Sequence, residues 1–182
     1  SAVEYCIACG KYLCGEKICE IGLLTAKERC KGCESDKTKL SLAYYLRTLS
    51  AIYLGKGKIV QAKKLCEKAL AIVTKIAERE KSDANLENVS ALFSQMGDIL
   101  KAQGKLGDAF KLYQRALTID RKQEEKSSTF QTQKAMARDY RDAGSILEER
   151  GNNEGAWELY CHSLEIYQRL ALKWGALPLY GE

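Results

Sequence analysis

The chain has 182 residues, enough for one compact domain or one short repeat array and too few for two independent cores of ordinary size. Its 29 basic residues are interleaved with 24 acidic ones, so the net charge of +5 describes a mixed surface and argues against a nucleic-acid partner. No apolar run approaches the roughly 20 residues that span a bilayer, and the chain does not open with a signal peptide. These features argue against a membrane partner and favour a cytoplasmic protein.

The composition predicts an all-α fold. The chain contains a single proline, Pro178, and Ala, Leu, Lys and Glu are abundant, whereas strand-type runs of Val and Thr are absent. Polar links that contain Ser, Asp or Asn separate the successive helical hairpins and supply residues that can cap the next helix. In chain order, the expected helices cover residues 3–9, 12–29, 38–54, 59–80, 86–102, 106–125, 129–150 and 154–174.

A repeat of 47 residues organises the chain. Glycines recur at this interval, and a small residue follows each of them after five positions. A second row, also mostly small, precedes each glycine by seven positions. Small side chains let the backbones of two packed helices approach closely, so the rows predict pairs of helices joined at the glycines. The three rows are Gly10, Gly57, Gly104 and Gly151; Gly15, Ala62, Ala109 and Ala156; and Val3, Ser50, Gly97 and Gly144.

The pattern resembles the tetratricopeptide repeat family. The resemblance implies a right-handed α-α superhelix of four helix-turn-helix repeats that forms a single domain over 1–182. The repeats would cover about 1–35, 36–82, 83–128 and 129–174, followed by a tail over 175–182. The unit is longer than the usual 34 residues or so, as in the elongated subclass that includes the kinesin light chain and the polarity adaptors. The clearest copy contains Phe93, Met96, Gly97, Leu100, Ala109, Tyr113 and Ala116, with its turn at Gly104.

The resemblance also implies where a partner would bind. In this family the first helix of each repeat lines the concave side, and ligand-facing positions lie at fixed offsets from the small residue of that helix. The matching positions combine basic residues with an aromatic and an aliphatic side chain, which predicts an acidic peptide with an apolar anchor. A clamp for an acidic carboxy-terminal tail is not expected, because Ala51 and Asp98 stand where that clamp needs asparagine. The expected partner-binding residues are Tyr44, Arg47, Leu54, Ser94, Asp98, Lys101, Arg138, Arg141 and Asp142.

The sequence carries no pattern typical of an enzyme. It has no phosphate-binding glycine loop, no metal-spaced histidines and no nucleophile elbow, so we expect neither catalysis nor a cofactor. The single histidine, His162, follows Cys161 on a helix, where adjacent side chains point about 100° apart and do not readily meet. We therefore expect a non-catalytic scaffold or adaptor.

The cysteines leave one alternative open. Two Cys-x-x-Cys pairs, at residues 6–9 and 30–33, have the look of a zinc ribbon, but the helix expected between them holds the pairs apart. Cys19 and Cys66 fall on core rows and are expected to be buried, and no metal ligand set is assigned. Cys6, Cys9 and Cys14 gather near one turn, so the alternative function is a regulatory module whose first repeat binds a metal or senses redox state. A homodimer through exposed repeat ends also stays open.

Overall fold

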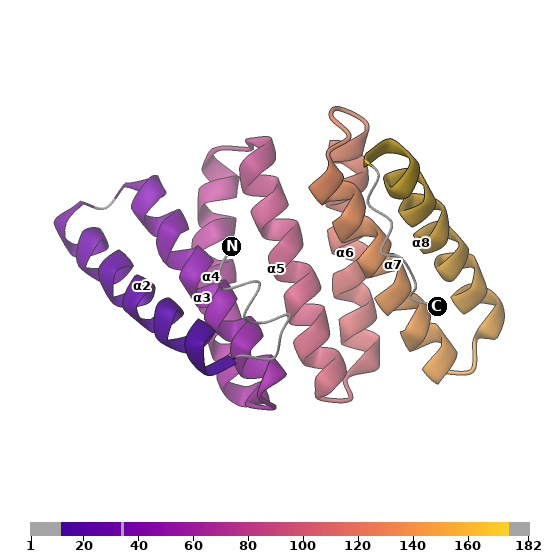
Figure 1. Ribbon diagram of the computed structural model, residues 1–182, viewed down its shortest axis with the longest axis horizontal. Coiled ribbons are helices and arrows are strands. Elements are labelled where there is room, and N and C mark those ends of the chain that lie inside the picture. Colours follow the sequence, from indigo (N-terminus) through magenta and orange to yellow (C-terminus); the bar gives the residue numbers. More distant parts are fainter. Residues whose placement is uncertain (1–11, 34, 175–182) are drawn as a thin grey trace.

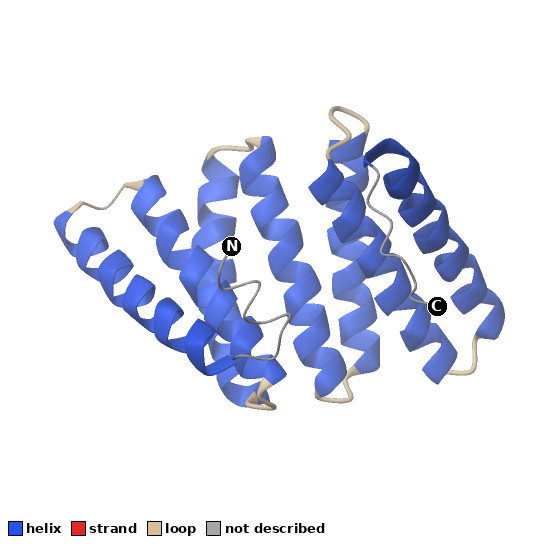
Figure 2. Ribbon diagram, viewed as in Figure 1, coloured by secondary structure: helices blue, strands red, loops and turns tan. Residues whose placement is uncertain are grey.

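The computed structural model describes residues 12–33 and 35–174, and this part of the chain contains seven helices and no strand (Figures 1 and 2). The protein is therefore all-α over the described residues, as expected. The helices are α2 (Tyr12–Gly32), α3 (Asp36–Gly55), α4 (Ile59–Arg79), α5 (Asp83–Ala102), α6 (Leu106–Glu124), α7 (Phe130–Glu149) and α8 (Asn153–Trp174).

The expected helix boundaries agree closely with the observed ones. The largest differences are of three residues, at the start of α5 and at the end of α2. Helix α5 begins early because Ser82 caps it: the Ser82 hydroxyl accepts a hydrogen bond from the backbone N–H of Asn85. The helix expected over 3–9 and the tail over 175–182 lie outside the described residues.

Three helix pairs are joined by turns of the same geometry. Gly57, Gly104 and Gly151 adopt φ values of 72°, 73° and 78°, the left-handed region in which a side chain would be strained. After each glycine, the next backbone N–H donates to the carbonyl oxygen five residues before it, at 2.8 to 2.9 Å. This capping arrangement ends the first helix and starts the second within a few residues, so the chain forms the hairpins α3–α4, α5–α6 and α7–α8.

Each helix packs against the helices before and after it in the chain. Within the described part, the only contacts between helices two apart join α3 to α5 and α5 to α7. The first helices of the hairpins therefore lie closer together than the second helices do. We call the surface formed by α3, α5 and α7 the inner face. Figure 1 shows α2 to α8 as successive layers from one end of the molecule to the other.

Small residues allow the two helices of a hairpin to approach. A Cβ atom added to Gly97 would lie 2.8 Å from Cε1 of the fully buried Tyr113, and one added to Gly144 would lie 2.8 Å from Cε1 of Tyr160. In the hairpin α3–α4, Ser50 occupies the same place and its hydroxyl donates to the Ala62 carbonyl at 2.8 Å. The predicted close approach of the helices at these positions is confirmed.

The apolar core is continuous in one half of the molecule and divided in the other. One cluster extends from Cys19 on α2 to Ala116 on α6. The second half contains two smaller clusters, one around Met136 and one around Tyr113. Cys19 and Cys66 are fully buried, as expected, and burial raises the pKa of their thiols to about 11 and about 12. None of the described helices is long and apolar enough to cross a membrane.

Candidate functional site

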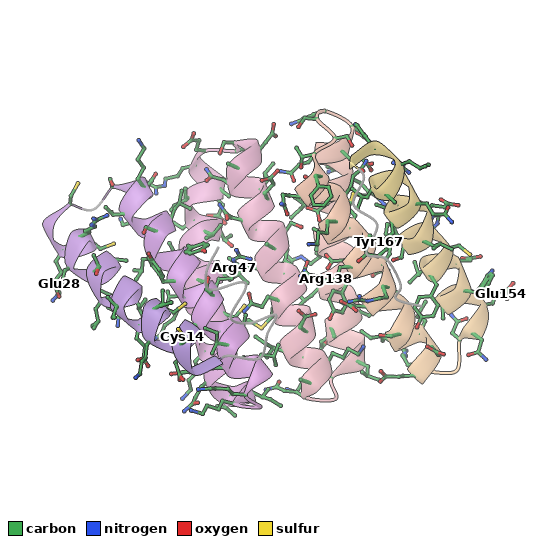
Figure 3. The ribbon with its side chains drawn as sticks, viewed as in Figure 1. Cys14, Glu28, Arg47, Arg138, Glu154 and Tyr167 are labelled. Atoms are coloured by element: carbon green, nitrogen blue, oxygen red, sulfur yellow. The ribbon has the colours of Figure 1, made fainter. Side chains whose placement is uncertain are left out.

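The nine residues expected to contact a partner all come from the three helices of the inner face. Figure 3 labels Arg47 and Arg138, which lie near the middle of the molecule. The helix α3 carries Tyr44, Arg47 and Leu54; α5 carries Ser94, Asp98 and Lys101; and α7 carries Arg138, Arg141 and Asp142.

A pocket of about 380 Å³ opens between these helices. Ala51, Leu54 and Ala91 give it an apolar side, whereas Arg47 and Arg138 bring guanidinium groups to it. We call it the basic pocket; its complete lining is Arg47, Ala51, Leu54, Gly55, Ala91, Gln95, Asp98 and Arg138. The structure thus brings four of the expected residues together in one depression, with an apolar surface beside two cations.

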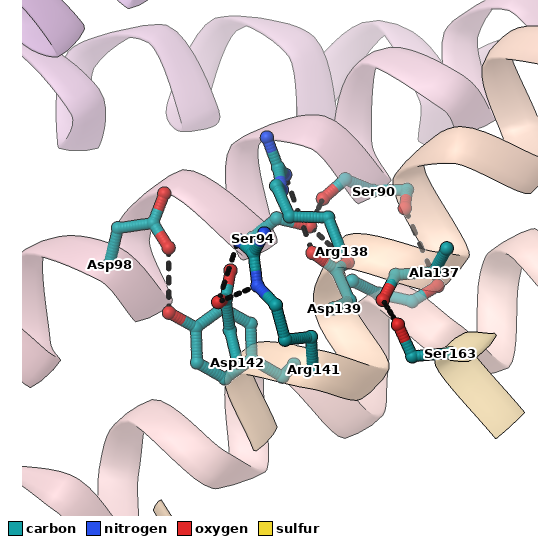
Figure 4. Close-up of polar contacts among 11 residues, drawn as sticks. Ser90, Ser94, Asp98, Ala137, Arg138, Asp139, Arg141, Asp142 and Ser163 are labelled. Carbon is teal, nitrogen blue, oxygen red and sulfur yellow. Dashed lines mark hydrogen bonds and ion pairs between the residues drawn. The ribbon is translucent and has the colours of Figure 1, made fainter. Parts of the chain in front are cut away.

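The expectation for Ser94 is wrong, because this side chain does not face a partner. Ser94 is only 1% exposed, and its hydroxyl donates to the Asp139 carboxylate and lies 3.2 Å from the Ser90 carbonyl oxygen. Asp139, which the sequence interpretation did not single out, is fully buried beneath Arg138 (Figure 4). Burial raises the pKa of Asp139 to about 7, although Arg138 and the Ser94 hydroxyl lower it.

Arg138 lies between buried carboxylates and the basic pocket. Its guanidinium is 3.3 Å from Asp139 Oδ1, yet the side chain remains 42% exposed. Burial lowers the pKa of Arg138, but Asp139 and Asp98 outweigh burial and hold it above its ordinary value. Its Nε is buried and has no hydrogen-bond partner among the described residues.

Asp98 is hydrogen-bonded by a residue of α6, the second helix of its hairpin. The hydroxyl of Tyr113, on α6, donates to Asp98 Oδ1 at 2.6 Å (Figure 4). Burial raises the pKa of Asp98 above its ordinary value, although this hydrogen bond lowers it. One oxygen of the Asp98 carboxylate is therefore engaged within the protein.

The remaining charged residues lie at the edge of the inner face. Arg141 pairs with Asp142 at 3.0 Å, and its side chain is 54% exposed while that of Asp142 is 18% exposed. Lys101 donates to the Ser145 hydroxyl and lies 3.9 Å from Glu149. Arg138 and Arg141 are more exposed than Asp139 and Asp142, the carboxylates that they pair with, so the accessible charge of these two pairs is mainly positive. The pair of Lys101 and Glu149 is the reverse, since Glu149 is 49% exposed and Lys101 is 30% exposed.

A second pocket of about 240 Å³ lies next to the basic pocket along α5 and shares Arg47 and Ala91 with it. Two carboxylates line it, Glu87 and Asp120, and we call it the acidic pocket. Asp120 is 2% exposed, and its Oδ2 has no hydrogen-bond partner among the described residues. Burial raises the pKa of Asp120 to about 6, although the Ser90 hydroxyl lowers it. The other lining residues are Asn88, Gln131 and Thr132.

Tyr44 stands at the α3 side of the inner face. Its exposed ring is 6.0 Å from the Arg47 guanidinium carbon and meets the Tyr45 ring edge-on at 5.4 Å between centroids. These contacts orient an aromatic surface beside Arg47. A pocket of about 10 Å³ between Tyr44, Arg47 and Leu92 is nearly closed.

The cysteines and the histidine form no site within the described residues. Cys14 and Cys30 lie on the same helix, α2, about 24 Å apart along its axis at 1.5 Å per residue. No group of three His, Cys, Asp or Glu side chains that could hold a metal occurs in 12–33 or 35–174. Cys6 and Cys9 lie outside the described residues. His162 is exposed, 3.9 Å from Glu165, and its ring packs against Tyr140.

The fold is similar to that of a known protein. The crystal structure of BtubC (BKLC) from P. vanneervenii aligns with a TM-score of 0.64 and 18% sequence identity. The alignment covers 93% of this chain and 59% of that chain, so this chain spans less than two thirds of the similar protein. The likeness concerns the fold and supports a helical-repeat, solenoid-like arrangement. No protein-family model and no curated protein sequence matches the chain.

Proposed function

We propose that the chain is a non-catalytic interaction domain that binds a peptide segment of a partner protein on its inner face. In this proposal the repeats are of the tetratricopeptide type with a period of 47 residues, and they form a right-handed superhelix over 1–182. The hairpin turns at Gly57, Gly104 and Gly151 support the period, because the same backbone geometry recurs at each of them.

The observation that carries the proposal is the distribution of charge on the inner face. Asp98 and Asp139 are engaged by Tyr113 and Ser94, while Arg138 and Arg141 remain about half exposed. Guanidinium groups bind carboxylates through paired hydrogen bonds, and the basic pocket adds apolar surface from Ala51 and Leu54 beside them. The ligand that fits this surface is a peptide with an acidic residue next to an apolar one.

The experiment is selection of a displayed library of random dodecapeptides on the immobilised domain. We expect enrichment of sequences that contain Asp or Glu beside a large apolar residue. The double charge reversal Arg47→Glu and Arg141→Glu should abolish this enrichment, while far-UV circular dichroism shows unchanged helicity.

The matched control reverses two exposed lysines of the outer helix α4, Lys64→Glu and Lys68→Glu, which changes the net charge by the same amount. This control should retain the enrichment. Recovery of the same peptides on the Arg47 and Arg141 double variant, or no enrichment on the unaltered domain, would overturn the proposal.

A further inference from the structure

The two pockets of the inner face carry opposite unsatisfied groups. In the basic pocket, Arg138 Nε is a buried donor without an acceptor among the described residues; in the acidic pocket, Asp120 Oδ2 is a buried acceptor without a donor. Buried polar atoms are normally hydrogen-bonded, and an unsatisfied one destabilises the protein by about 1 to 3 kcal/mol. Asp120 and Arg138 each line an open depression, where a ligand could supply the missing partner.

The acidic pocket differs from its counterpart one repeat earlier. Counting back 47 residues from Glu87 and Asp120 leads to Leu40 and Val73, which line the nearly closed pocket of about 10 Å³. Where the chain has apolar residues at these positions, the pocket is filled; where it has carboxylates, a pocket of about 240 Å³ stays open. A buried carboxylate beside an open space is costly unless it meets a positive charge or a donor.

The pockets are adjacent, which fixes the spacing of the groups that they would bind. On α5 the acidic pocket is lined by Glu87, Asn88 and Ala91, and the basic pocket by Ala91, Gln95 and Asp98. The two sets are centred about six residues apart, or about 9 Å along the helix. An extended peptide covers this distance in about three residues.

We propose that the acidic pocket binds a lysine or arginine side chain of the partner peptide, about three residues from the acidic residue that the basic pocket binds. The inference rests on the proposed function and makes it more specific: the recognised segment carries both signs of charge. Asp120 accepts a hydrogen bond from the incoming cation through Oδ2, and Glu87 contributes the second carboxylate. Arg47 lines both pockets, so the bound cation would lie on the Glu87 and Asp120 side of the acidic pocket.

The test compares dodecapeptide libraries selected on the unaltered domain and on the double variant Glu87→Gln and Asp120→Asn. Both substitutions keep the shape of the side chain and remove its charge. At the buried position 120, a neutral amide costs less to bury than a carboxylate, so the variant should still fold. A second double variant, Glu67→Gln and Asp108→Asn, makes the same chemical changes on the outer helices α4 and α6, where both residues are exposed.

The unaltered domain and the outer-helix variant should enrich Lys or Arg at a fixed distance from an acidic residue. The acidic-pocket variant should retain the acidic preference and lose the basic one, and a recovered peptide should bind it about tenfold more weakly in fluorescence anisotropy. Enrichment of acidic residues alone, unchanged by the substitutions, would refute the cation pocket and leave the proposed function standing. No enrichment at all would refute both.

Discussion

The contact between the hairpins α3–α4 and α5–α6 and the contact between α5–α6 and α7–α8 use corresponding positions differently. We call them the first and the second seam. The first seam buries Val73 and Leu92, whereas the second buries Asp120 and Asp139, each 47 residues later. The same backbone arrangement thus tolerates an apolar or an acidic pair at one place.

The difference has a visible consequence for the core. A single apolar cluster crosses the first seam, whereas two separate smaller clusters cross the second seam, where Ser94 and Arg138 contact Asp139. Replacing a buried polar network by apolar residues is often neutral or stabilising, so such a network is weak evidence for a stabilising role. Asp120 and Asp139 are therefore better understood as part of a binding surface than as stabilising contacts, while two apolar clusters that join α6 to α7 hold the second seam together.

The largest effect is expected from moving an acid into the first seam. Val73→Asp places a carboxylate among apolar side chains, where no serine corresponds to the Ser90 that stands beside Asp120. We expect a loss of about 4 kcal/mol in the free energy of unfolding, measured by urea denaturation at pH 7. The control, Val60→Asp, changes a valine that is exposed on the same helix and should cost less than about 1 kcal/mol. Equal losses in the two variants would show that burial is not the cause.

A second change tests the hairpins that the seams join. Ser50 and Cys66 stand 47 residues before Gly97 and Tyr113, which meet in α5–α6. Cys66→Tyr should overpack the first hairpin and lower the free energy of unfolding by about 3 kcal/mol. Adding Ser50→Gly should recover at least about 1 kcal/mol, because it restores the glycine and tyrosine combination. Additive losses in the double variant would contradict this equivalence of the two hairpins.

Replacing Asp139 by leucine, the residue at the corresponding position of the first seam, should change how the free energy of unfolding depends on pH. The pKa of Asp139 is about 7 in the folded protein and about 3.9 in an unfolded chain. Its contribution to stability is therefore fully present below pH 4 and is lost as the pH rises through 7. Asp139→Leu should reduce the fall in the free energy of unfolding between pH 4 and 8 by up to about 4 kcal/mol, because the two pKa values differ by about 3. The control Asp108→Leu changes an exposed residue and should leave the slope of unfolding free energy against pH unchanged. If Asp139→Leu kept the same slope, groups other than Asp139 would be responsible for the pH dependence.

The smallest effect is expected from removing one donor in the second seam. Ser94→Ala deprives Asp139 of a hydrogen bond and should lower the free energy of unfolding by about 1 kcal/mol at pH 8. The loss should be smaller at pH 5, where Asp139 is protonated. Ser127→Ala, at an exposed serine in the link between α6 and α7, serves as the control. A loss that is equal at both pH values would argue against a role of Ser94 toward the carboxylate.

The sequence predicts the helices better than it predicts the site. Glycine spacing and small residues specify where helices turn and touch, because these are local steric requirements, and the boundaries agree within three residues. The inner-face positions follow from the resemblance, but the burial of Ser94 depends on how closely α5 and α7 approach. Asp120 and Asp139 are not among the residues that the sequence predicts at the site. Aligning the repeats at an interval of 47 residues could have indicated their burial, since they correspond to the apolar residues Val73 and Leu92.

Because the helices pack almost entirely against their neighbours in the chain, local unfolding should differ between the ends and the middle of the array. Each end helix is held from one side within the described part, and α2 and α8 expose apolar residues such as Ile21, Leu24, Trp157 and Leu172. Fraying from either end therefore breaks a single interface, whereas opening α5 or α6 requires two interfaces to separate. Amide hydrogen exchange would consequently be slowest in the middle of the array, which is where both inner-face pockets are found.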